Sequence, residues 1–559
     1  MAATLQQALL VNIVSGLGSH LYFRHYEPEN YWKTAGVMVS LPMIPAAMLV
    51  PHVSSVPLAI GLAFLIFFST LFSSIVLYRV SPLHPLAGYP GPLLWRITKF
   101  APAWYGHKGK HHIQLKKLHE RYGPIVRIGP NELSIVDKDL IPFILGAQGM
   151  PKGPLWEGRR ILPSKNYNVN NSLVAVRDLE RHAQLRKPWN KAFGTGPLKD
   201  YEEMLVVRAG LLMDRLEGHC KAARDKIGRV DLAKWVSFFA FDFMGDIAFA
   251  SDFSLLQDGD VNGFIKNMED AHYLPTIVQH IPWMAKVTRV TPWVGSKLQK
   301  FGAFALAQAR KRAATTMMHK DLFYHLIQAT DPDLAASPLP LIMANAILTI
   351  IAGSDTSASA VTSIIYFLLR NPECHKKLQK EIDDTFGFDE GDPAITPDKL
   401  AQLPYLNAVI NEAMRVFPPV ASSVQRAPKI GSGGKMVGSM FIPEGTSVTV
   451  PPYVYHRDPR YFSPNPDTFW PERWLVEGDG KIVHERGAFI PFSAGPANCA
   501  GKPLALMEIR YVTSLLIRTF DMSLDENFDP VAWENSLTDR LVLCKGPLPV
   551  NLTRRSTSS

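Results

Sequence analysis

A run of 45 residues without Asp, Glu, Lys or Arg, residues 34–78, constrains this chain more than any other feature. Its last part, Val56–Tyr78, is apolar and, as a helix, is long enough to cross about 30 Å of hydrocarbon. Gly36–Val50 predicts a second, shorter span interrupted by two prolines, and Leu5–Phe23 predicts a third span or an interfacial helix. We therefore expect residues 1–81 to form a membrane anchor with one to three hydrophobic spans.

The residues around this anchor favour retention over cleavage. A cleaved signal peptide usually has a basic start, but no Lys or Arg precedes the first apolar run, and the longest run comes late. Arg79, directly after the last span, predicts that the following domain faces the cytosol. Residues 82–92, PLHPLAGYPGP, predict a stiff Pro/Gly hinge, and residues 93–559 are expected to form one catalytic domain.

Composition and charge restrict the class of that domain. Hydrophobic residues make up 47% and charged residues 19%, which is enough apolar material for a large core. The formal charge of +9 suits a membrane surface or an acidic protein partner, and no nucleic-acid-binding motif is present. The four cysteines are widely spaced, with no CxxC pair, which argues against a disulfide scaffold or a cysteine-rich metal cluster. They are Cys220, Cys374, Cys499 and Cys544.

The segment FSAGPANCAGK, residues 492–502, places one cysteine in a turn bracketed by glycines. Gly495 precedes Cys499 by four residues and Gly501 follows it by two. Glycine permits tight turns in which backbone N–H groups approach a sulfur and stabilise a thiolate. A helical apolar pattern follows at once, so the helix dipole favours the same charge. A lone cysteine is usually core packing, but this context indicates a thiolate metal ligand, preceded by the strand-like segment AFIPF.

A second motif lies inside a long apolar segment that ends at Arg370. We predict a helix because Ser337 suits the N-cap, Pro338 suits the first turn and Asn371-Pro372 stops the pattern. Asp355 and Thr356 lie in its middle, where polar side chains are costly unless satisfied. The motif is either a kinked core helix or a proton-delivery site.

A third motif pairs an acid with two arginines. Glu412 and Arg415 are three residues apart on a predicted helix and share one face. The later segment FWPERW contains Arg473. An exposed ion pair would contribute little, so the motif matters only if it is buried.

Together these motifs resemble the cytochrome P-450 family of haem-thiolate monooxygenases over roughly residues 85–550. The cysteine pattern of the family matches at Phe492, Gly495, Cys499 and Gly501, whereas Ala497 occupies a position that is usually basic. The resemblance implies a mainly α fold with small β-sheets, the cytochrome P-450 fold, behind an N-terminal transmembrane anchor.

The resemblance also implies a role for each site residue. Cys499 would be the axial thiolate ligand to the iron of haem b, in a loop shaped by Phe492, Gly495 and Gly501. Asp355 and Thr356 would relay protons on the distal side. The propionate-binding cations would be His182, Arg186 and Arg426, with His456 nearby, and the buried structural triad would be Glu412, Arg415 and Arg473.

The implied reaction inserts one oxygen atom from O₂ into a lipophilic substrate by hydroxylation or epoxidation. The expected setting is secondary-metabolite (terpenoid or polyketide) biosynthesis or xenobiotic oxidation. No flavin or dinucleotide domain follows, so we expect electrons from a separate NADPH-cytochrome P-450 reductase, with cytochrome b5 as a further candidate. Lys187 and Lys191 would attract such a partner, and the expected location is the endoplasmic reticulum membrane with the catalytic domain facing the cytosol.

Two other functions remain open at this stage. One is a haem-thiolate isomerase or lyase that rearranges peroxides, and the other is a non-catalytic haem sensor. The Asp355-Thr356 pair disfavours both, because neither needs a proton relay.

Overall fold

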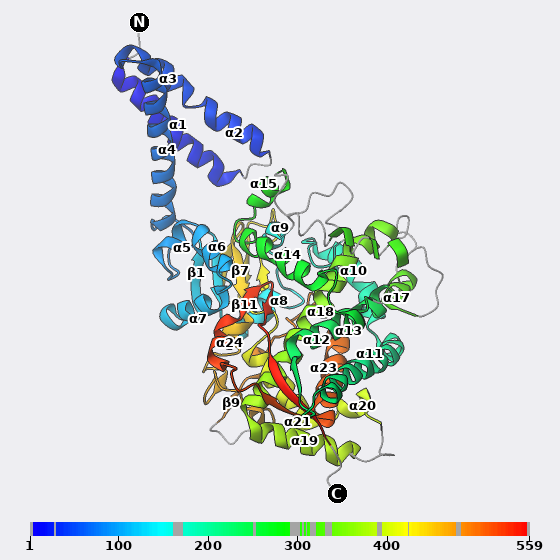
Figure 1. Cartoon of the computed structure of the whole chain (residues 1–559). Helices are drawn as coiled ribbons and strands as arrows, with labels where there is room; N and C mark the ends of the chain where they lie inside the picture. The colour runs from blue at the N-terminus through cyan, green and yellow to red at the C-terminus, as the bar shows by residue number, and fades with distance from the viewer. Residues whose placement is uncertain are drawn as a thin grey trace. The chain divides into compact units, whose positions relative to one another are not determined.

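The computed structural model describes residues 4–26, 30–159, 172–249, 253–290, 302–304, 307–308, 310–312, 320–329, 338–387, 394–422, 424–476 and 482–555. The chain separates into two compact units, residues 1–98 and 99–559. Figure 1 shows both units and the labels used below.

The N-terminal unit is helical, as its apolar runs predict. It contains α1 (Leu5–His25), α2 (Tyr31–Ser40), α3 (Met43–Leu49), α4 (Val56–Val80) and α5 (Leu93–Ile97). The second apolar run breaks into α2 and α3 beside Pro42, because proline cannot donate the backbone bond that a continuous helix needs. The segments Trp32–His52 and Val56–Val80 are long and apolar enough to cross a membrane.

Helices α1 and α4 run parallel and pack along their length. The Asn12 side chain donates to the Ala63 carbonyl at 2.9 Å, and His20 bonds the Ser74 hydroxyl at 2.6 Å. A Cβ at Gly16 would lie only 3.0 Å from the Phe67 carbonyl oxygen, so the two backbones approach closely there. Small and polar residues of α1 thus face its neighbour.

The opposite face of α1 is apolar and exposed. Its members are Leu10, Val14, Leu17 and Leu21. Buried Asn12 and Ser19 with exposed leucines invert the pattern of a water-soluble helix and are typical of helices packed within lipid.

The larger unit is mainly α, as expected. Its first helices are α6 (Phe100–His107), α7 (His111–Tyr122), α8 (Ile141–Leu145), α9 (Leu155–Gly158), α10 (Leu179–Ala192), α11 (Thr195–Ala222), α12 (Leu232–Phe249), α13 (Leu255–Asp258), α14 (Phe264–Val278) and α15 (Met284–Val290). They are followed by α17 (Leu322–Ala329), α18 (Pro338–Arg370), α19 (Pro372–Phe386), α20 (Pro397–Leu400), α21 (Pro404–Val416), α22 (Pro452–Tyr455), α23 (Lys502–Thr519) and α24 (Pro530–Ser536).

The strands form small sheets. One has the order β1 (Ile125–Gly129), β2 (Glu132–Ile135), β7 (Ser447–Val450), β4 (Val424–Arg426), in which β2 and β7 are parallel. A second joins β10 (Phe520–Leu524), β13 (Pro549–Arg554) and β3 (Gly228–Asp231). The two-stranded pairs are β11 (Thr538–Arg540) with β12 (Val542–Cys544), β5 (Gly434–Val437) with β6 (Met440–Pro443), and β8 (Phe462–Ser463) with β9 (Val483–His484).

Helix α18 runs through the core of this unit and packs against α12, α21 and α23. Its part Leu348–Arg370 is also apolar enough to cross a membrane, but most of it is buried inside the unit. A Cβ at Gly353 would overlap Met244 of α12, so this glycine lets the two helices approach closely. The helix begins at Pro338 and ends before Asn371, as the sequence predicts; Ser337, the expected N-cap, lies outside the described residues.

One local expectation was wrong. The segment AFIPF, residues 488–492, is not a strand: it leaves the short 3₁₀ helix Arg486–Ala488 and enters a turn. The Ile490 N–H donates at 2.9 Å to Nε2 of His456 instead of to a neighbouring strand. A short run of apolar residues alone did not distinguish these two partners.

Candidate active site

Cys499 lies in a tight loop that ends at the start of α23. Gly495 has a φ of +69°, and a Cβ there would overlap the carbonyl oxygen of Leu145. The Cys499 N–H donates to the Phe492 carbonyl at 2.9 Å, and the Asn498 N–H donates to the Gly495 carbonyl at 3.1 Å. These bonds fix the loop. Gly501 has a φ of −82°, which any residue adopts, so backbone conformation does not require glycine there.

The Cys499 thiol combines exposure with electrostatic support. It is the exposed member of the four free cysteines. Desolvation by the surrounding protein raises the pKa of the thiol, while backbone N–H groups of Gly501 and Lys502 and the Arg186 guanidinium oppose this rise. The described residues contain no group of three or more His, Cys, Asp or Glu side chains placed to hold a metal ion. Any metal at Cys499 would therefore need other ligands, as in a macrocycle.

Asp355 and Thr356 lie in the middle of α18, and their side chains differ in surroundings. The Thr356 hydroxyl donates to the Ala352 carbonyl at 2.6 Å, and Ala352, on the same face, is exposed. Asp355 is buried, with one carboxylate oxygen 3.8 Å from Nζ of Lys545. The Thr356 hydroxyl is thus accessible, whereas the neighbouring Asp355 carboxylate lies in the interior.

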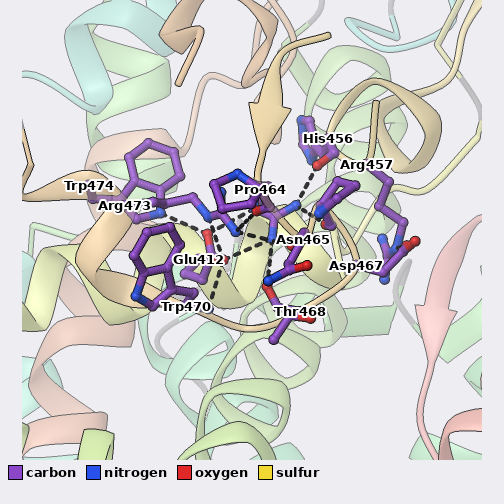
Figure 2. Close-up of polar contacts among 12 residues, drawn as sticks. Glu412, His456, Arg457, Pro464, Asn465, Asp467, Thr468, Trp470, Arg473 and Trp474 are labelled. Atoms are coloured by element: carbon purple, nitrogen blue, oxygen red, sulfur yellow. Dashed lines mark hydrogen bonds and ion pairs between the residues drawn. The ribbon is translucent and has the colours of Figure 1, made fainter. Parts of the chain in front are cut away.

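Glu412, Arg415 and Arg473 meet in a fully buried network (Figure 2). Both carboxylate oxygens of Glu412 accept from Arg415 at 2.8 Å, and Arg473 donates to one of them at 3.0 Å. Burial raises the pKa of Glu412, but the hydrogen bonds and charge of the arginines outweigh this and leave the pKa below its ordinary value. The carboxylate is therefore charged and satisfied.

The network extends to the chain that leads into the cysteine loop. Arg415 donates to the backbone carbonyls of His456, Pro466 and Thr468. The buried His456 ring accepts from the Ile490 N–H, and burial lowers its pKa to about 3, so the ring stays neutral. We expected His456 near propionates; the structure gives it this connecting contact.

Four basic side chains gather beside the cysteine loop. They are Lys152, His182, Arg186 and Arg426, of which all but Arg186 are buried. Burial, followed by the charges of Arg426 and Arg186, places the pKa of Lys152 well below its ordinary value. Burial and the charges of the other three lower the pKa of His182 to about 4, and burial lowers that of Arg426 to about 10. Their mutual repulsion calls for an anion.

Arg186 connects this basic group to the cysteine loop. Its guanidinium donates to both the backbone carbonyl and the side-chain oxygen of Asn498, the residue before Cys499. Its Nε–H donates to the side-chain oxygen of Asn190 at 2.7 Å. The helix that carries His182 is thus bonded to the loop that carries the thiol.

This arrangement fits a haem. The two propionates of a haem would supply the negative charge that these four basic side chains lack among the described residues, and the exposed thiol is a suitable axial ligand. The acid–alcohol pair on α18 has the groups needed to hold and move a proton.

The fold and site are compatible with a haem-thiolate protein, and comparison with known proteins shows the family. The cytochrome P-450 family model matches residues 87–550, so this chain belongs to that family of haem-containing oxidoreductases.

Individual relatives are fungal monooxygenases. The chain is similar to tryprostatin B 6-hydroxylase of Aspergillus fumigatus, with 32% identity over 97% of this chain and 95% of the relative. It is also similar to the cytochrome P-450 monooxygenase notG' of Aspergillus versicolor, with 31% identity over 98% of both chains. Cytochrome P-450 67 of Uromyces fabae is 31% identical over 96% of this chain and 98% of the relative.

Two residues of the site escaped sequence reasoning. Lys152 pairs with Arg426 through a backbone bridge, and Lys545 faces Asp355 from the C-terminal hairpin. Neither stands in a motif, and the paired residues lie far apart in the chain, at positions 152 and 426 and at positions 355 and 545. Closely spaced residues such as Phe492–Gly501 form a recognisable sequence motif, whereas residues that meet only in the folded chain do not.

Proposed function

We propose that this protein is a membrane-anchored monooxygenase that holds haem b through the thiolate of Cys499. It inserts one oxygen atom from O₂ into a lipophilic substrate, by hydroxylation or epoxidation. The observation that carries this proposal is the Arg186–Asn498 bond, which joins a largely buried group of basic side chains to the loop of an exposed cysteine.

The chain's own residues divide the work. Bound haem supplies oxygen activation, which an axial thiolate promotes. Lys152, His182, Arg186 and Arg426 would bind the propionates, and Lys152, once paired with a propionate, would supply the positive charge that Ala497 cannot. Thr356 presents a hydroxyl that passes on a proton, and Asp355, its neighbour on α18, returns a proton to that hydroxyl.

The proton relay also separates this function from the alternatives. An isomerase or lyase acting on peroxides needs no O₂-linked protons, and a haem sensor needs no relay. The accessible Thr356 hydroxyl with the buried Asp355 beside it supports the monooxygenase. Turnover without NADPH and reductase would favour the isomerase.

Electrons are proposed to come from a membrane-bound NADPH-cytochrome P-450 reductase, with cytochrome b5 as a second donor. Lys187 and Lys191 are exposed one turn apart on α10, the helix that Arg186 ties to the cysteine loop. Lys502, exposed at the start of α23, adds to this charge. An acidic partner surface would be attracted to this side.

The relatives support the substrate class. The name tryprostatin B 6-hydroxylase denotes a hydroxylation, and the similarity to that protein extends over nearly the whole of this chain. We propose a lipophilic secondary metabolite, such as a terpenoid or polyketide, with xenobiotic oxidation as the alternative.

The anchor is proposed to cross the endoplasmic reticulum membrane three times. Because α1 contacts α4 from Asn12 to Arg24, a membrane around α4 also surrounds α1. Arg24, Lys33 and Arg79 belong to the same end of this unit, which should face the cytosol. A glycosylation acceptor added before residue 5 should then be modified, and one placed at residues 26–30 should not. The reverse pattern, or modification at neither site, would contradict three spans.

The test of the main proposal is the carbon-monoxide difference spectrum of the reduced protein. The wild type should show the Soret band of a thiolate-ligated haem, and Cys499→Ser should lose it. An unchanged band in Cys499→Ser would refute the ligand. Lys152→Met should keep the band but lose haem on the order of tenfold faster, because one charged hydrogen bond is removed. A substrate screen with NADPH and reductase would then identify products.

A further inference from the structure

Lys545 is a buried lysine whose position no motif explains. It directly follows β12, and its side chain is 7% exposed, against 8% for the Asp355 side chain that it faces. Its Nζ lies 3.8 Å from Oδ1 of Asp355. The other carboxylate oxygen, Oδ2, is buried without a hydrogen-bond partner among the described residues. Two buried groups of opposite charge at this distance attract each other strongly, because water screens them little.

Other titratable groups face the same carboxylate. Helix α14 contributes Glu269 and His272, and β12 contributes Cys544. Burial and then the Asp355 charge raise the pKa of Glu269, whereas Lys545 opposes the rise. On the other side of α18, Ser357 bonds Glu508 of α23. Lys545 thus forms an ion pair with Asp355 and also acts electrostatically on Glu269.

We propose that Lys545 is the counter-ion that keeps Asp355 ionised and oriented between proton deliveries, and so sets the rate and pH dependence of proton transfer to Thr356. This inference rests on the proposed monooxygenase function. Lys545 touches neither substrate nor haem in this scheme, so it is a positioning residue.

The proton balance shows what the lysine contributes. Asp355 takes up a proton on its unpartnered oxygen and passes a proton toward the Thr356 hydroxyl, which leaves the carboxylate charged. A buried carboxylate without a cation is unfavourable, so without Lys545 the proton would stay on Asp355. The ion pair with Lys545 therefore stabilises the carboxylate form of Asp355. Glu269 opposes this stabilisation, because its carboxylate attracts the same cation.

The effect expected of each variant depends on whether it removes a charge that stabilises or one that destabilises the Asp355 carboxylate. Lys545→Met should raise the pH at which Asp355 titrates, Lys545→Arg should stay near the wild type, and Glu269→Gln should lower it. Lys429→Met removes an exposed lysine elsewhere and serves as the control. Asp355→Asn identifies the relevant infrared carboxyl band by removing it.

The first experiment is infrared difference titration of that band in the haem-containing full-length proteins. An upward shift in Lys545→Met, with Lys545→Arg and Lys429→Met near the wild type, supports the pair. Unshifted titration in Lys545→Met overturns it. If Lys545→Met fails to bind haem, Glu269→Gln and Lys545→Arg decide: a downward shift in Glu269→Gln supports the proposal, and no shift in Glu269→Gln overturns it.

The second experiment measures reductase-supported NADPH consumption against pH, in H₂O and D₂O. Lys545→Met should slow it on the order of tenfold, enlarge the solvent isotope effect and move the pH profile upward, and Lys545→Arg should restore most of the rate. A rate loss without a change in isotope effect or profile would indicate a structural role and overturn the proposal. A wild type without the thiolate Soret band would refute the proposed function itself, whereas the infrared titration reports on the pair independently.

Discussion

Gly495 is subject to two independent constraints at one position. Its φ of +69° lies in the left-handed region, and its α-carbon lies against the Leu145 carbonyl. Ser493, in the same loop, also has a φ of 60°, so the close approach to Leu145 is what singles out Gly495. The cysteine loop is thus held by contact with α8 as well as by its own hydrogen bonds.

Gly495→Ala should therefore displace the loop and weaken haem binding. The left-handed conformation alone costs a residue with a Cβ roughly 1–2 kcal/mol, and the overlap with Leu145 adds to this. Haem content after purification and the reduced-CO spectrum measure the effect. Gly487→Ala is the matched control, because a Cβ at Gly487 meets nothing within 4 Å. Equal haem retention in both variants would contradict this account.

At the scale of elements, the anchor helices show how packing replaces the hydrophobic effect. Helix α1 turns Asn12, Gly16 and Ser19 toward α4 and exposes its leucines. Within lipid, close backbone approach and interhelical hydrogen bonds hold helices together, because lipid chains solvate leucine as well as another helix does.

Gly16→Leu should separate α1 from α4, whereas Gly18→Leu should not. A Cβ at Gly16 would lie 3.0–3.2 Å from Phe67 and Thr70, but one at Gly18 meets nothing within 4 Å. Overpacking of this kind costs roughly 1–3 kcal/mol. Disulfide formation between Asn12→Cys and Ala63→Cys in membranes reports the contact. The prediction fails if both leucine variants cross-link as well as the parent pair.

The buried network of Glu412 is a second example of contacts between elements, here in the larger unit. Helix α21 supplies Glu412 and Arg415, and the later 3₁₀ helix Pro471–Trp474 supplies Arg473 and the indole of Trp474, which donates to Glu412 at 2.9 Å. Both oxygens of the Glu412 carboxylate accept hydrogen bonds, so the network fixes the segment between α21 and this 3₁₀ helix (Figure 2). That segment includes His456, which bonds the approach to the cysteine loop.

For the whole molecule, Glu508 makes stability depend on pH. It is buried on α23 and bonds Ser357 of α18, and burial raises its pKa from 4.5 to about 8. The folded state holds this proton to higher pH than the unfolded chain does. The contribution to stability is therefore complete below about pH 4.5 and is lost as the pH rises through about 8.

Glu508→Gln should remove this dependence. Between about pH 6 and pH 8 the wild type should lose about 2 kcal/mol of unfolding free energy relative to Glu508→Gln, because each pH unit in this window costs up to about 1.4 kcal/mol. Denaturant unfolding of both proteins in detergent at the two pH values gives the comparison. Parallel pH profiles would show that Glu508 ionises alike in both states.

Much of the fold could be predicted because the relevant signals are local. The length of residues 56–78 predicted α4, and the prolines around residues 338–370 predicted the ends of α18. The prediction failed at AFIPF, where a short apolar run indicated a strand but the buried His456 ring accepted the backbone N–H of Ile490. An apolar run identifies a buried segment, but it does not identify the partner of its backbone.

The sequence by itself determined the family, the cysteine loop, the acid–alcohol pair and the apolar anchor, because each is encoded by residues close together in the chain. Only the tertiary structure decided that Lys152 joins the basic group beside Cys499, that Lys545 faces Asp355 and that α1 packs parallel to α4. These contacts join residues far apart in the chain. Burial and charge become effective only when folding brings such groups together and removes water between them.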